Sequence, residues 1–272
     1  MAQKQQTDYA HIVLSCLEDH YLRREISLDH HSLVRIISGE MNVTQGDHSY
    51  TFVAGDTLLL PRNQLSMVTK KPRDGRYFKS VMMSFTTDRL KALYTSEGFR
   101  SLKLHTHKIR AFQNHPLLES VFASLEPYFE LTSELPETIV SLKLEETLAI
   151  LRTLDSDIDD LLSDFSEPGK LDLTNFMENH FKFNLTMDKF GHLTGRSLNT
   201  FKRDFHKAFN TTPQKWLTQK RLELAHYQLA EKQRKPVEIF LEAGFENLSH
   251  FSFAFKKHYG YPPTAALRQK SV

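Results

Sequence analysis

The chain has 272 residues, of which 40% are hydrophobic and 25% are charged, and its formal net charge is +2. This composition is typical of an ordinary folded protein and excludes a largely disordered chain, a collagen and a small disulfide scaffold. No apolar run approaches the roughly 18 residues that a membrane-spanning helix needs. Cys16 is the only cysteine, so an internal disulfide and a cysteine-based zinc site are excluded, and we expect a cytoplasmic protein.

The small net charge conceals an uneven distribution along the chain. Residues 1–115 carry 16 Lys or Arg and 11 Asp or Glu, residues 116–167 carry 2 and 13, and residues 168–272 carry 17 and 9. The three balances are therefore +5, −11 and +8. A basic end on a nearly neutral chain is typical of a protein with a nucleic-acid-binding part, although an ordinary solvated surface would give the same counts.

The first segment has the pattern of a β domain. Short apolar and β-branched runs at 33–38, 41–44, 50–53 and 57–60 are separated by turns rich in Gly, Asp and Asn. Such a succession predicts a sandwich or a barrel.

Helices are predicted in the acidic segment that follows. Pro116 and Pro136 stand where a proline can begin a helix, and apolar residues then recur at spacings of three and four. Two alternatives stay open for Leu144, Leu148 and Leu151: they face a second copy of the chain, or they pack on the β domain of their own chain. Residues 163–169, which include Pro168-Gly169, are the predicted linker.

The segment from Lys170 onward is predicted to be helical and to contain one motif twice. Gly191 and Gly195 have the spacing that a helix-turn-helix needs, with a small residue in the first helix and a glycine in the left-handed turn. In the second copy the turn is at Gly244, and Phe251 and Phe255 occupy the places that Phe201 and Phe205 occupy in the first.

A single helix is predicted between the two copies, from Trp216 to about Ala230, after the capping pair Thr212-Pro213. Fifteen residues of helix are about 22 Å long. The major groove of DNA returns after about 34 Å, so one chain could read two successive major grooves.

The last hundred or so residues, 170–268, resemble the DNA-binding domain of the AraC/XylS family of bacterial transcription regulators. The resemblance implies two helix-turn-helix subdomains joined by a linker helix. It rests on Arg203-x-Phe205, Thr212-Pro213, Arg221-Leu222-x-x-Ala225, Glu242-Ala243-Gly244-Phe245, Ser249-x-Phe251, Phe255-Lys256-Lys257 and Gly260-x-Pro262-Pro263.

Matched position by position, the resemblance places the base-reading side chains of the first copy at Asn199, Lys202 and Arg203. Asn and Arg are the side chains that pair with adenine and guanine edges in the major groove. The base-reading places of the second copy fall on Leu248, Ser249, His250 and Phe253. We expect phosphate contacts from the cations around both turns, which are Lys189, Arg196, Lys207, Lys256 and Lys257.

The second copy departs from the family pattern at two places. Phe240 stands where a small residue is usual, and Phe253 stands where a polar or basic side chain is usual. We therefore predict that the first copy supplies most of the sequence discrimination and that the second mainly holds phosphate. Arg221 is predicted to be a structural ion pair or cap rather than a phosphate contact.

The β segment resembles the cupin-like barrel that such regulators often carry, on the residues Ser38-Gly39-Glu40-Met41 and Gly55-Asp56-Thr57-Leu58-Leu59-Leu60-Pro61. His30 and His31 are adjacent and point to opposite faces of a strand, so we expect neither a metal nor another cofactor. Polar residues that could line an effector site are Arg35, Tyr50 and Arg62; for each, a surface position is the alternative.

We therefore predict an α+β chain with a cupin-like β-barrel or sandwich over 1–112, a helical dimerisation or packing segment over 113–166 and an AraC-type DNA-binding domain over 170–268. The predicted function is a sequence-specific transcription regulator, an activator, that binds double-stranded promoter DNA and RNA polymerase. An unknown small molecule or protein would act on the first domain, and residues 116–152 could form a homodimer. The alternatives are a cupin-type enzyme and a protein-interaction module, each with an appended helical domain.

Overall fold

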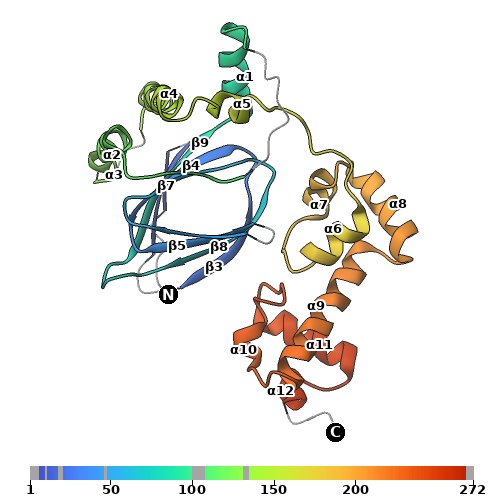
Figure 1. The fold of residues 1–272 in the computed structure, drawn as a ribbon. Helices are drawn as coiled ribbons and strands as arrows, with labels where there is room; N and C mark the ends of the chain where they lie inside the picture. Colours follow the sequence, from blue (N-terminus) through green and yellow to red (C-terminus); the bar gives the residue numbers. More distant parts are fainter. Residues whose placement is uncertain are drawn as a thin grey trace. The chain divides into compact units, whose positions relative to one another are not determined.

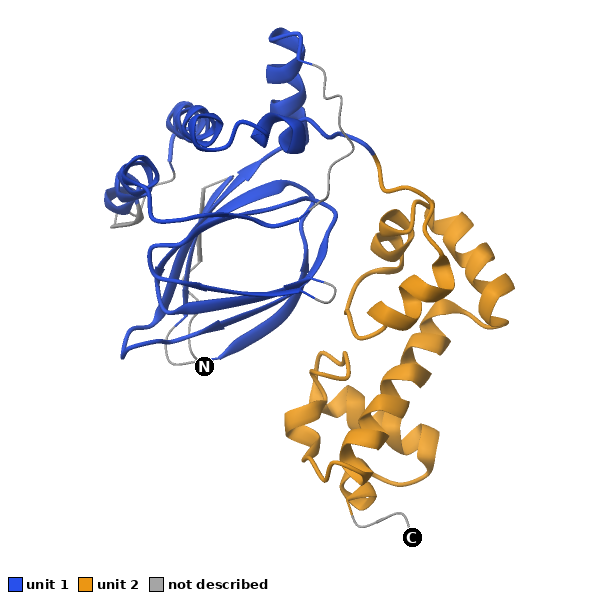
Figure 2. Ribbon diagram, in the orientation of Figure 1, with its two compact units in different colours: residues 1–166 blue, residues 167–272 orange. Residues whose placement is uncertain are grey.

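The computed structural model describes residues 6–9, 11–17, 21–45, 48–99, 108–130 and 135–267. The chain divides into two compact units, residues 1–166 and 167–272 (Figure 2). The division falls inside the predicted linker 163–169. The helices predicted for 113–166 belong to the same unit as the strands.

The first unit contains two antiparallel sheets (Figure 1). The six-stranded sheet has the order β1 (Gln6–Tyr9), β2 (Ile12–Leu17), β9 (Phe78–Phe85), β4 (His31–Ser38), β7 (Thr57–Leu60), β10 (Arg110–Phe112). The four-stranded sheet has the order β3 (Leu22–Ser27), β8 (Leu65–Lys71), β5 (Glu40–Gln45), β6 (His48–Val53). Strand pairing keeps the two sheets separate within the described residues. The α+β class is confirmed, and the domain is a sandwich rather than a closed barrel.

Strand β4 shows why this part of the sequence is a continuous apolar run rather than an alternating one. Leu33 points into the cluster beneath the helices, whereas Val34 and Ile36 belong to the cluster between the two sheets. Successive side chains of a strand point to opposite faces, and here both faces are covered.

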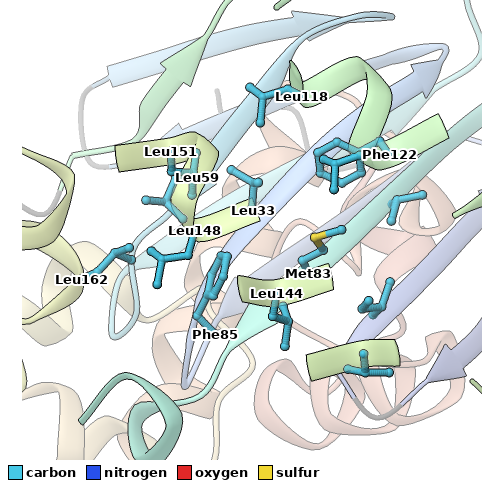
Figure 3. Close-up of a cluster of buried hydrophobic side chains, with 14 of the residues drawn as sticks. Leu33, Leu59, Met83, Phe85, Leu118, Phe122, Leu144, Leu148, Leu151 and Leu162 are labelled. Atoms are coloured by element: carbon cyan, nitrogen blue, oxygen red, sulfur yellow. The ribbon is translucent and has the colours of Figure 1, made fainter. Parts of the chain in front are cut away.

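Five helices of the described first unit follow or flank the strands: α1 (Thr87–Ser96), α2 (Pro116–Ala123), α3 (Glu126–Glu130), α4 (Glu137–Leu154) and α5 (Ile158–Leu162). Side chains from α2, α4 and α5 cover the outer face of the six-stranded sheet, where they meet Leu33, Met83 and Phe85 (Figure 3).

The structure decides between the two alternatives for the leucines of α4. Leu144, Leu148 and Leu151 are buried in this cluster of their own chain, so these three side chains do not offer a dimer surface. A homodimer through residues 116–152 would have to use other side chains, such as the exposed Leu117 and Leu142.

The second unit is helical. Its helices are α6 (Leu173–His180), α7 (Met187–Leu193), α8 (Leu198–Phe209), α9 (Pro213–Ala230), α10 (Pro236–Ile239), α11 (Leu248–Tyr259) and α12 (Pro263–Ala266). Helix α9 has 18 residues, and it begins at Pro213 because the Thr212 side chain caps it by accepting from the Lys215 backbone N–H. Its length is therefore about 27 Å, rather than the 22 Å predicted.

Two separate cores form along α9. Trp216 and Leu217 belong to the core that also holds Phe201 and Phe205, whereas Leu222 is part of a second core. The other members of the second core include Ala225, Leu229, Phe251 and Phe255. One continuous helix thus carries the two motifs, one near each end (Figure 1).

Candidate nucleic-acid interface

The first helix-turn-helix consists of α7, a tight turn and α8. Gly195 has a φ of +66°, and a Cβ atom there would lie 2.6 Å from backbone atoms of Pro168 and Gly169. Only glycine fits both requirements. At Gly191 a Cβ would lie 3.0 Å from the Arg196 carbonyl oxygen, so the small residue allows the helices to cross closely, as predicted.

Helix α8 presents one apolar face and one polar face. The Ser197 side chain caps the helix by accepting from the Thr200 backbone N–H, and Phe201 and Phe205 are completely buried. The opposite face exposes Asn199, Lys202, Arg203 and Lys207. The side chain of Arg203 is 65% exposed, and its Nη2 lies 3.3 Å from Asp204 Oδ1. This face therefore offers amide and guanidinium donors to a groove.

Arg196 is predicted to contact phosphate, and the structure corrects this prediction. Its side chain is only 7% exposed, its Nε lies 3.2 Å from Asp204 Oδ2, and its Nη1 donates to the carbonyl oxygens of Thr194 and Leu171. The hydrogen bond from Arg196 and the neighbouring Arg203 hold the pKa of Asp204 below its usual range. Arg196 therefore fastens the turn to α8 and is not available to a phosphate.

The second helix-turn-helix consists of α10, a turn and α11. The N-cap Asn247 accepts from the His250 backbone N–H at 2.7 Å. Phe251 and Phe255 are completely buried, as their counterparts are in the first motif. Phe240 is partly buried and packs at the edge of the second core. The exposed residues of α11 include Ser249, His250, Phe253, Lys256 and Lys257.

Direct contacts tie the two motifs to each other. Arg221 is nearly buried on α9, and it donates from Nε to the Phe181 carbonyl and from Nη2 to the Phe183 carbonyl, both at 2.9 Å. Phe181 and Phe183 lie in the segment between α6 and α7, so the predicted structural role of Arg221 is confirmed as a link from the linker helix to the first motif.

The turn of the second motif also reaches this segment. Gly244 has a φ of +89°, and a Cβ there would lie 2.7 Å from the Lys182 carbonyl oxygen and 2.8 Å from Arg221 Nε. Asn184 donates to Glu246 Oε1 at 2.6 Å. The second turn therefore packs against Arg221 and the α6–α7 segment, which fixes one motif relative to the other.

A half-buried histidine lies just before the first motif. His180, at the end of α6, stacks on Phe176 with ring centroids 4.4 Å apart, and its Nδ1 lies 2.7 Å from the Phe176 carbonyl oxygen. Burial lowers the pKa of His180, against the opposing effect of that hydrogen bond. The ring is therefore a packing element rather than a cation for DNA.

The residues predicted to line an effector site belong to the first unit. Arg35 is buried and donates to the Gly55 carbonyl, to Thr57 Oγ1 at 3.1 Å and to Asn114 Oδ1 at 2.9 Å. Arg62 is buried and donates to the Ser166 carbonyl at 2.8 Å. Tyr50 stacks between His48 and Phe52 on β6. The two arginines therefore hold loops in place.

A cavity of about 190 Å³ lies between the two sheets, and none of the three predicted effector residues lines it. Lys70 Nζ donates to Ser15 Oγ at 3.1 Å within its lining. Inward positions on β3 alternate as Leu22, Arg24 and Ile26, a period of two that could have indicated them from the sequence. The complete lining is Val13, Ser15, Leu22, Arg24, Ile26, Leu28, Val34, Met41, Leu60, Val68, Lys70, Ser80 and Met82.

The part of the chain that the structure describes holds no cluster of three or more His, Cys, Asp or Glu side chains that could bind a metal ion. None of its helices combines the length and the apolar character needed to cross a bilayer.

Comparison with known proteins covers both units. The family model described as a helix-turn-helix domain matches residues 192–269, and the model described as the ExsA N-terminal regulatory domain matches residues 31–163. The HTH-type transcriptional regulator ExsA of Pseudomonas aeruginosa is 25% identical over 244 residues, which are 86% of this chain and 85% of ExsA.

Two further similarities extend this comparison. The thermoregulatory protein LcrF of Yersinia pestis is 28% identical over 158 residues, which are 57% of this chain and 58% of LcrF, so the match spans little more than half of either protein. A crystal structure of an apo ToxT variant from Vibrio cholerae aligns with 94% of this chain and 96% of its own, at 12% identity and a TM-score of 0.48.

Proposed function

Because the chain belongs to the AraC/XylS family of bacterial transcription regulators, we propose that it is an activator that binds promoter DNA through residues 170–268. Members of this family are transcription regulators, which favours a regulator over the cupin-type enzyme. The proposed working place is the cytoplasm, where the promoter and RNA polymerase are found.

The observation that carries the proposal is the equivalence of α8 and α11. Both helices have 12 residues and a capping side chain, and both bury two phenylalanines at the fourth and eighth positions after the cap. Their opposite faces are exposed and carry cations and hydrogen-bond donors. A recognition helix needs these two faces, one to fix it on its domain and one to enter the major groove.

The linker helix supports the reading of two successive grooves. Helix α9 is about 27 Å long, and adjacent turns of the major groove are about 34 Å apart. The contacts of Arg221, Gly244 and Asn184 hold the motifs in one arrangement, so binding does not have to order them. We propose that Asn199, Lys202 and Arg203 read bases in one groove and that α11, through Ser249 and His250, enters the next.

Selection of bound duplexes from random DNA by the full chain tests this function. The expected result is enrichment of sites with two blocks of defined sequence, separated by about 10 base pairs. Failure to enrich any sequence would contradict sequence-specific binding. Transcription from a promoter carrying the selected site, with purified RNA polymerase, would then test activation.

Phosphate contacts are proposed for the exposed lysines at the end of α11. Lys256→Ala is expected to weaken binding to all sequences alike and to reduce the slope of log affinity against log salt by about one, because one phosphate contact is lost. Fluorescence anisotropy titrations at several salt concentrations measure both effects. Lys108→Ala, at an exposed lysine of the first unit, is the control and should leave the slope unchanged. A loss confined to the selected site would contradict the phosphate role; Lys257, Lys207 and the half-buried Lys189 are proposed for the same role.

For the first unit we propose that the cavity between the sheets holds the effector. Its lining is mostly apolar, with Arg24, Lys70, Ser15 and Ser80 as the polar members, which suits a small apolar molecule with an anionic group. A thermal-shift screen of the full chain with such molecules should find compounds that raise the melting temperature. Lys70→Met should abolish the shift, while Lys71→Met, at the neighbouring lysine that pairs with Glu40, should retain it. Shifts equal in both variants would contradict this placement, and a screen without hits would favour a protein effector.

A homodimer through residues 116–152 remains a prediction. It would place two copies of the DNA-binding domain on one promoter and would match a repeated site. Sedimentation of the free chain and of the chain on the selected duplex measures the stoichiometry.

A further inference from the structure

A large aromatic side chain is exposed on the recognition helix of the second motif. Phe253 is 68% exposed, in the middle of α11, while its neighbours Phe251 and Phe255 are completely buried. An exposed phenylalanine at this level is unfavourable in water. Its position on the outward face of a proposed recognition helix calls for an occupant that has apolar groups of its own.

Aligning α11 with α8 from their N-caps shows which residue of the first motif corresponds to Phe253. Phe253 lies six residues after the N-cap Asn247, and Arg203 lies six residues after the N-cap Ser197. Ser249 and Ser252 correspond in the same way to Asn199 and Lys202. Phe253 thus occupies in the second motif the position from which Arg203 faces the groove in the first.

We propose that Phe253 reads thymine through the 5-methyl group in the second major groove. This inference rests on the proposed function and adds a specificity-determining residue to it. Thymine is the base that presents a methyl group in the major groove, and apolar side chains, phenylalanine among them, make contact with it. The second motif therefore selects bases as well as holding phosphate. This replaces the weaker role in base reading that was expected because position 253 lacks a polar or basic side chain.

The charges around Phe253 favour DNA over a protein partner. Lys256 and Lys257 lie three and four residues further along α11 and are exposed, so they share its outward face with Phe253. An apolar group bordered by cations is complementary to a thymine methyl bordered by phosphates. The core of an ordinary protein–protein interface is instead depleted of charged residues, lysine above all.

Replacement of thymine by deoxyuridine removes the methyl group alone and provides the test. In the selected duplex each thymine of the second block is replaced in turn, and the affinity of the full chain is measured at fixed salt. Wild type is expected to lose about three- to five-fold at one position, the effect of uncovering one methyl group. Phe253→Ala should bind the thymine and deoxyuridine duplexes equally, and Phe253→Leu should retain part of the discrimination.

Two further variants sharpen the result. Tyr21→Ala removes another exposed aromatic side chain, which lies in the first unit, and should discriminate as wild type does. Phe253→Arg should shift the preference at that position from thymine to guanine, because it restores the side chain of the first motif. Since Phe253 is exposed, these variants should melt at the wild-type temperature.

The outcomes separate the inference from the function on which it rests. If wild type binds the selected duplex tightly but is indifferent to deoxyuridine at every position, the thymine contact is overturned and DNA binding stands. If Phe253→Ala instead changes self-association or binding to another protein, the exposed ring is a protein contact and the inference is again overturned. If no duplex is preferred over random DNA, the proposed function itself fails.

Discussion

Arg203→Ala is expected to weaken binding to the selected DNA site by about 1–3 kcal/mol, or about five- to 150-fold, with little effect on random DNA. The Arg203 side chain is 65% exposed on the outward face of α8, and the hydrogen bonds from its guanidinium to Asp204 are long, at 3.3 and 3.4 Å. It can therefore turn to a guanine and donate two hydrogen bonds to O6 and N7. Anisotropy titrations on both kinds of DNA give the two losses.

Two controls separate base reading from simple charge. Arg203→Lys retains the positive charge but not the planar pair of donors, so it should lose specificity while binding random DNA as wild type does. Lys207→Ala removes an exposed cation one turn further along α8 and should weaken both kinds of DNA equally. An equal loss on both kinds of DNA for Arg203→Ala would sink its role as a base reader.

Gly244→Ala should lower the free energy of unfolding of the second unit by about 2–5 kcal/mol. A φ of +89° is unfavourable for a residue with a side chain, at about 1–2 kcal/mol. The added Cβ would also lie 2.7 Å from the Lys182 carbonyl oxygen and 2.8 Å from Arg221 Nε, and such overpacking adds about 1–3 kcal/mol. Urea denaturation of the full chain, followed by the fluorescence of Trp216, measures the change.

Gly260→Ala is the matched control within the same motif. Gly260 has a similar φ of +82°, at the end of α11, but its Cβ would meet nothing within 4 Å. We expect a loss of only about 1–2 kcal/mol there, from backbone strain alone. If the two variants lose the same stability, the second turn is not packed tightly against the α6–α7 segment, and the fixed arrangement of the motifs would have no support.

The parts of the fold that the sequence predicts well are those with local causes. Thr212 is the predicted capping residue of the linker helix, and its side chain caps α9 in the structure. Gly195 and Gly244 are the left-handed turn residues that the spacing predicts. The faces of α8 follow from the four-residue spacing of its phenylalanines. All of these depend on neighbours within a few residues along the chain.

The predictions that were wrong, and the alternatives that the sequence left open, depend on contacts between residues far apart in the chain. Arg196 is a cation beside the first turn, where a phosphate contact is expected. Its hydrogen-bond acceptors, however, include the carbonyl of Leu171, which is 25 residues away. The leucines of α4 would show the same spacing against a partner or against their own sheet. Arg35 and Arg62 are polar residues in apolar surroundings, and only the fold reveals that their partners are structural.

The cavity between the two sheets is another feature that depends on contacts between distant parts of the chain. Its lining comes from seven strands, β2, β3, β4, β5, β7, β8 and β9, and from Leu28 just after β3. No local pattern indicates which inward positions share a cavity, although the alternation on β3 shows which residues point inward. Phe253 is the converse case: the sequence marks it as a departure, and its exposure in the structure supplies the reason to give it a role.

We propose that α9 holds α8 and α11 apart so that one chain reads two successive major grooves. Insertion of five base pairs between the two blocks of the selected site turns the second block to the opposite side of the duplex, and insertion of ten restores its side at twice the separation. We predict that both insertions reduce the affinity of the full chain to that of a site with one block, because neither the side nor the separation can be adapted. Undiminished binding to either duplex would contradict the claim.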